Sequence, residues 1–261
     1  MNIILREWKS YVRQTTYWMI GLFLLLFISF YKMDGLSSTP GGIQTILESL
    51  PPALQVFFGS ASDMGTGIGI YQMIHLYLAI ALSLHAVILG AHIFAKEEHD
   101  KTFEFLYVKG VKRIRILCDK MIAGVVILLV LDVVCVLGVY MSIAMMNMSL
   151  SFMDLLPYMS ALCMMQLFFF SMSLLISLLM KQNQKAGAIG CGIVFVMFMI
   201  TMYGKMGGNV EVLDKLSLFH YTDASYIQGN DMFSIPTLCI AILILVGCIG
   251  SQWIHERRDL L

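Results

Sequence analysis

Long apolar stretches alternate with short charged segments along the whole chain. Six of these stretches contain at most one Asp, Glu, Lys or Arg residue. They lie at about residues 14–32, 70–95, 121–146, 156–180, 186–204 and 233–254. A helix needs about 20 apolar residues to cross about 30 Å of hydrocarbon. Because lipid offers no partner to unpaired backbone groups, each stretch predicts a helix. The expected fold class is an all-α polytopic membrane protein with six transmembrane helices.

The composition excludes several other classes of protein. Of the 261 residues, 59% are hydrophobic and only 13% are charged. Soluble domains carry about 25% charged residues. This chain could not cover a soluble surface, so a soluble enzyme, a disordered chain and a nucleic-acid binder are excluded.

The basic residues predict the orientation. With the N-terminus inside, 14 of the 17 lysines and arginines fall on the inner side, and Lys32, Lys205 and Lys215 fall on the outer side. Inner loops carry the excess of Lys and Arg in membrane proteins. We therefore expect both termini in the cytoplasm, outer loops at 33–69 and 205–232, and an inner loop at 96–120.

Residues 1–13 combine an apolar face with basic residues. Ile4, Trp8 and Tyr11 recur at helical spacing, and Arg6, Lys9 and Arg13 lie on other faces. This pattern is typical of an amphipathic helix on the inner leaflet. It fits the basic flank of a first span equally well.

The inner loop at 96–120 concentrates charge. Acidic residues come first and basic residues later, which favours a short helix because negative charge is stabilising at a helix N-terminus. Phe103 and Leu106 would share a face of that helix, and Gly110 is a natural break. On charge alone, however, the favoured interpretation is a solvated loop that follows the positive-inside rule.

The order of residues in this loop resembles the inner loop of type-2 ABC transporter permeases. The matching positions are Glu97, Glu98, Thr102, Phe103, Glu104, Phe105, Leu106, Arg113 and Lys120. The C-terminal HERRDLL, with Arg257, Arg258 and Asp259, and the stretch Leu216, Leu218, Phe219 and Tyr221 are also similar to the family. The loop departs from it at Lys101, where Gly is common, and at Gly110, where Pro is common.

The resemblance implies a coupling helix that docks on a cytoplasmic ABC ATPase. Its residues here would be Glu97, Glu98, Thr102, Phe103, Glu104, Leu106 and Arg113. Two permease halves pair with two ATPases, so the second half is either another copy or a homologous permease. The chain has no GxxxxGK[ST] motif. We expect no enzyme activity and no cofactor in it, with ATP and Mg on the partner ATPase.

One acid interrupts the predicted spans. A carboxylate near the bilayer centre costs about 2.5–3.5 kcal/mol, so Asp132 should face protein or water. It could line a transport path or hold a proton. We favour instead an interhelical hydrogen bond, to His85 or Gln166, because one isolated acid makes a poor proton relay. These three residues form the candidate polar site within the membrane.

A metalloprotease is disfavoured, because the second histidine of HExxH is missing after His255 and Glu256. No metal site is expected: His85 and His92 would lie about 10 Å apart along a helix.

The 21 Met and 16 Phe residues suit adaptable apolar walls. Together with these walls, the resemblance to type-2 ABC permeases implies an exporter of a peptide, drug or lipid-like substrate in the bacterial plasma membrane. The alternatives are an ion-gradient-driven carrier and an accessory or immunity membrane protein without an ATPase.

Overall fold

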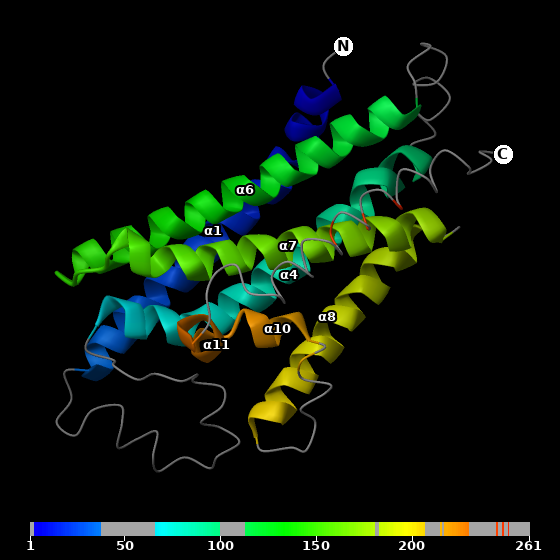
Figure 1. Cartoon of the computed structure of the whole chain (residues 1–261). Helices are drawn as coiled ribbons and strands as arrows, with labels where there is room; N and C mark the ends of the chain where they lie inside the picture. Colours follow the sequence, from blue (N-terminus) through cyan, green and yellow to red (C-terminus); the bar gives the residue numbers. More distant parts are fainter. Residues whose placement is uncertain are drawn as a thin grey trace.

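Long helices make up the described part of the chain. The computed structural model describes residues 3–37, 66–99, 113–180, 183–206, 215, 217–229, 244, 247 and 250. Its long helices are α1 (Ile3–Ser37), α4 (Gly67–His99), α6 (Arg113–Met145), α7 (Phe152–Leu179) and α8 (Asn183–Lys205). Two short helices follow, α10 (Leu218–Tyr221) and α11 (Ala224–Gly229) (Figure 1).

Five of these helices are long and apolar enough to cross a membrane. They coincide with the first five predicted spans, and every regular element in the described ranges is a helix. The sixth predicted span, 233–254, lies outside the described residues except for Ile244, Gly247 and Gly250. The membrane-spanning, all-helical character is thus confirmed, and the number of six spans stays a prediction.

Local chemistry fixes the short connection between α6 and α7. Asn147 has a φ of 54°, a left-handed conformation that Asn tolerates better than most residues. The hydroxyl of Ser151 then caps α7 by accepting a hydrogen bond from the N–H of Met153 at 3.3 Å. Asp154 lies in the first turn of α7, where negative charge is favoured. This connection is as short as the apolar pattern predicts.

Helix α4 lies at the centre of the bundle and contacts α7, α8, α1 and α6. Small residues allow the close approach. A Cβ atom on Gly90 would lie 2.7 Å from the carbonyl oxygen of Phe170, and one on Gly190 would lie 2.6 Å from Val87. Small residues at four-residue spacing allow such contacts. In α4 and α8 they bring helices of one subunit together.

Helices α1 and α6 run side by side along one flank of the bundle (Figure 1). Leu22, Leu26 and Phe30 of α1 are buried, and a Cβ atom on Gly138 of α6 would lie 2.9 Å from Leu26. The N-terminal segment continues α1 without a break, and Tyr11 is only 5% exposed. It is therefore described better as the basic flank of the first span than as a separate helix on the leaflet.

The outward face of α6 is apolar and exposed along its length. Its exposed residues are Ile122, Val126, Leu129, Val133, Leu137, Met141 and Met145. They recur every three or four residues, which places them on one side of the helix. An uninterrupted apolar face of this kind is what a helix presents to lipid.

Helices α10 and α11 fold back onto the bundle beside the end at which α4 begins (Figure 1). The ring of Phe219 packs against Phe198 and Phe169, with centroids 5.7 and 6.1 Å apart. The aromatic stretch of the predicted third outer loop is therefore part of the core at Leu218 and Phe219. Leu216 lies outside the described residues.

Candidate functional site

A polar pair joins α6 and α7 within the apolar interior. The side-chain amide of Gln166 donates a hydrogen bond to Oδ1 of Asp132 at 2.5 Å. Gln166 is fully buried. The second oxygen of Asp132, Oδ2, and the amide oxygen of Gln166 have no hydrogen-bond partner in the described part of the chain. The pair thus joins the two helices, and the thiol of Cys163 on α7 is also hydrogen-bonded to the carboxylate of Asp132.

His85 is not part of this pair. It lies on α4, where its ring meets the edge of Trp18 on α1 with centroids 5.1 Å apart. Its side chain is fully buried, and among the described residues neither ring nitrogen has a hydrogen-bond partner. An unpaired buried polar group costs about 1–3 kcal/mol. The candidate polar site of the sequence therefore divides into two places, the Asp132–Gln166 pair and the His85–Trp18 contact.

The inner loop is anchored by a buried lysine. Lys120 of α6 is 0% exposed, and its ammonium donates a hydrogen bond to the carbonyl of Ile93 on α4 at 2.8 Å. The two helices that carry the loop are thereby joined at its base. From the sequence alone, Lys120 was identified only as part of the family pattern. Its position beside an apolar stretch was the signal that it must find an acceptor or reach water.

The predicted coupling residues lie at the limit of the described structure. Helix α4 reaches His99, so Glu97 and Glu98 belong to its last turn, and Arg113 is the first residue of α6. The side chains of these three lie outside the described part, as do residues Thr102, Phe103, Glu104 and Leu106 altogether. Their role in docking stays a prediction.

A cluster of polar side chains lies at the other end of α4. The amide of Gln72 donates to the hydroxyl of Tyr158 at 2.8 Å. Nε2 of His75 donates to the carbonyl of Thr222 at 2.7 Å, and its Nδ1 lies 3.1 Å from the hydroxyl of Tyr71. These bonds join α4 to α7 and to the residue that follows α10. The signal in the sequence was the helical spacing of 71, 72 and 75 within an apolar stretch.

An ion pair strengthens the same contact. Lys205 at the end of α8 pairs with Asp223, which precedes α11 and also accepts a hydrogen bond from Ser225. Burial raises the pKa of Asp223, but the ammonium of Lys205 and these two hydrogen bonds outweigh it and hold the pKa below its usual value. The short helices are thus fastened to α8 as well as to α4.

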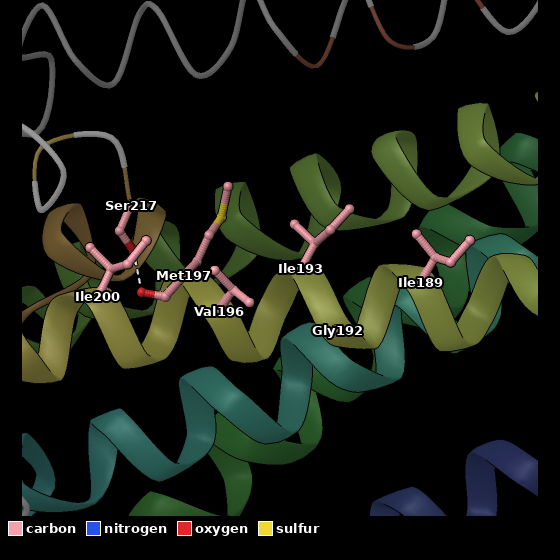
Figure 2. Close-up of a pocket in the computed structure, with 7 residues that line it drawn as sticks. All are labelled: Ile189, Gly192, Ile193, Val196, Met197, Ile200 and Ser217. Atoms are coloured by element: carbon pink, nitrogen blue, oxygen red, sulfur yellow. Dashed lines mark hydrogen bonds between the residues drawn. The ribbon is translucent and has the colours of Figure 1, made fainter.

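An apolar pocket of about 390 Å³ lies along α8 (Figure 2). Ile189, Gly192, Ile193, Val196, Met197 and Ile200 line it, together with Ser217. The hydroxyl of Ser217 donates to the carbonyl of Met197 at 2.9 Å, which leaves the walls apolar. Pockets for small molecules span about 300–1,000 Å³.

In the ranges that the structure describes, no group of three or more His, Cys, Asp or Glu residues could hold a metal ion.

Five long apolar helices, with polar pairs and an apolar pocket between and beside them, define the class of multi-pass membrane proteins. A model of the ABC-2 family transporter proteins matches residues 1–260, essentially the whole chain. The chain belongs to this family of ABC transporter permeases. A comparison with curated proteins finds no match.

Proposed function

We propose that the chain is the permease subunit of an ATP-driven exporter. It would move an amphipathic or hydrophobic substrate, such as a peptide, a drug or a lipid-like molecule, out of the cell across the bacterial plasma membrane. The match to the ABC-2 family over residues 1–260 carries this proposal. The family is a membrane transport subunit that typically lacks its own ATPase.

The apolar pocket on α8 supports the class of substrate. A hydrophilic ion needs polar groups to replace its hydration shell, and the walls of this pocket offer almost none. Its flexible Met197 side chain can adapt to molecules of different shape. Asp132 does not line the pocket and is already bonded to Gln166. The pocket therefore favours apolar cargo.

The inner loop supports an ATPase partner. Lys120 joins the two helices that carry it, and this rigid base would let a docking force on the loop move α4 and α6 together. ATP and Mg would be held by the partner ATPase. A second permease, either another copy or a homologue, would complete a complex of two permeases and two ATPases surrounded by membrane lipids.

The test is co-purification with an ATPase, followed by transport in proteoliposomes. Glu104→Lys or Phe103→Asp should detach the ATPase or uncouple ATP hydrolysis from transport, because either change alters the docking face and leaves the spans intact. Glu211→Lys makes the same charge change in the predicted outer loop and should leave coupling unchanged. Wild-type transport by the two inner-loop variants would refute the coupling assignment.

The carboxylate of Asp132, which lies within the apolar span of α6, favours one rival function, a carrier that couples to an ion. The same proteoliposomes test it. An exporter of amphipathic cargo should keep its transport rate in Asp132→Asn and should not depend on Na⁺ or K⁺. Uptake specific to one of these ions, lost in Asp132→Asn, would replace the exporter with the ion-coupled carrier.

A further inference from the structure

His85 is a buried polar residue whose ring makes no hydrogen bond within the described part of the helix bundle. Its side chain is 0% exposed, and neither ring nitrogen has a hydrogen-bond partner in the described part of the chain. The other histidine deep in α4, His75, uses both of its nitrogens. Most buried polar atoms in proteins are hydrogen-bonded, so an exception calls for a reason. A ligand that supplies the missing partner is such a reason.

A groove lies beside His85, between α1 and α4. It has a volume of about 240 Å³ and is lined by Tyr17, Trp18, Gly21, Leu22, Leu25 and Ala81. Ala81 is one helical turn from His85 on α4, so both lie on the side that faces α1. The ring of Trp18 lines the groove and also touches His85. A change of the Trp18 rotamer would open the groove to the imidazole.

Polarity changes along the groove in the order that a membrane amphiphile requires. Arg13 lies at one end, where its Nε donates to the hydroxyl of Tyr17 at 3.2 Å. Trp18 comes next and its ring contacts His85, which does not itself line the groove; the walls around Leu22 and Leu25 are apolar. Arg13 and Leu25 are about 18 Å apart along the helix axis. With the N-terminus inside, a head group at His85 would lie nearer the inner surface and its chain would point to the bilayer centre.

We propose that this groove binds a single-chain amphiphile with an uncharged hydrogen-bonding head, drawn from the inner leaflet. The head bonds to His85, the chain fills the space beside Gly21 and Ala81, and Trp18 covers the imidazole when the site is empty. The volume corresponds to roughly eight water-sized groups, which suits an alkyl chain of about eight carbons. The proposal rests on the orientation predicted from the basic residues and adds a site distinct from the pocket on α8.

Quenching of Trp18 fluorescence tests the site directly. The chain has three tryptophans, and replacing Trp8 and Trp253 by Phe leaves Trp18 as the reporter. In nanodiscs, 8-bromo-1-octanol should quench it saturably and bind about tenfold more tightly than 1-bromooctane, because only the alcohol can bond to His85. His85→Phe should abolish this preference. The same change at the exposed His92 of α4 is the matched control and should preserve it.

A second variant keeps the test decisive if His85→Phe does not fold. Gly21 has open space where a Cβ would stand, so Gly21→Leu fills the groove without a clash. It should remove saturable quenching by the alcohol. Equal quenching by alcohol and alkane, a preference that survives His85→Phe, or saturable quenching that survives Gly21→Leu would each overturn the proposal.

The amphiphile could be exported cargo or a resident membrane component, and a second experiment separates these. If 8-bromo-1-octanol stimulates ATP hydrolysis by the assembled complex and Gly21→Leu removes the stimulation, the groove holds cargo. Binding without stimulation assigns it to a resident amphiphile, and either result supports the site. The quenching assay needs no ATPase. Failure to find an ATPase partner would therefore refute the proposed function and leave the binding result intact.

Discussion

The contact of Gly90 with the backbone of α7 makes the sharpest stability prediction. In Gly90→Ala, the new Cβ on α4 would stand 2.7 Å from the carbonyl oxygen of Phe170 and 3.2 Å from Cβ of Ser173. Both neighbours belong to α7, and the carbonyl is backbone, so relief requires the two helices to move apart. The hydroxyl of Ser173 also donates to the carbonyl of Val87 at 2.7 Å, and this bond would be stretched by the same movement.

The matched control is Gly192→Ala on α8, where nothing lies within 4 Å of the added atom. Both substitutions gain the same helix propensity of about 1 kcal/mol, so this gain cancels when the two variants are compared. Overpacking costs about 1–3 kcal/mol. Gly90→Ala should therefore be less stable than Gly192→Ala by that amount, which corresponds to roughly 2–12 °C in Tm for a chain of this size.

The assay is thermal unfolding of the purified protein in one detergent, followed by far-UV circular dichroism or by fluorescence. Wild type, Gly90→Ala and Gly192→Ala are compared at the same protein concentration. The expected order places Gly192→Ala at or above wild type and Gly90→Ala below Gly192→Ala. If Gly90→Ala unfolds at the same temperature as Gly192→Ala or above it, α4 and α7 are not packed at Gly90 as described.

Three further predictions concern buried polar groups. Lys120→Met should lower Tm, because it removes a charge-assisted hydrogen bond worth about 1.5–3 kcal/mol, whereas Lys185→Met at an exposed position should not. Asp132→Leu should lower Tm more than Asp132→Asn, since only Asn keeps an acceptor for the amide on α7; equal values would contradict the pairing. Because the folded pKa of Asp223 is lowered, its stabilisation is complete above the unfolded value of about 3.9 and is lost as the pH falls below it. The Tm of wild type should therefore fall more steeply than that of Asp223→Asn in this acid range.

The pattern of apolar residues predicted the spans because every segment that crosses the lipid must pair its backbone hydrogen-bonding groups within itself. A long stretch without charge must form a helix that pairs its own backbone groups, wherever the helix lies in the bundle. The predicted span 70–95 and α4 at Gly67–His99 differ by three and four residues at their ends, and α6 at Arg113–Met145 begins eight residues before the predicted 121–146. Both helices extend past the hydrocarbon-length stretch at their inner ends, where charged residues continue the helix out of the membrane.

Contacts between helices could not be predicted in the same way. His85 and Gln166 were equal candidates as partners of Asp132, because each is a lone polar residue in an apolar stretch. The rotation of α7 places Gln166 against α6, and the rotation of α4 turns His85 towards Trp18 instead. The nearly uniform hydrophobicity of these spans carries no information about rotation, because no single face is marked as the buried one.

The sequence by itself determined that the chain is a helical membrane protein, and its inner-loop residues already resembled the ABC transporter permeases to which the chain belongs. Only the tertiary structure decided that α4 is central, that Lys120 joins the base of the inner loop, and that the residues from Ser217 to Ser225 fold back onto α8 and α4. The physical reason is that crossing a membrane depends on composition alone. The choice of partner depends instead on which small residue meets which backbone and which donor reaches which acceptor, and these matches involve residues far apart in the chain.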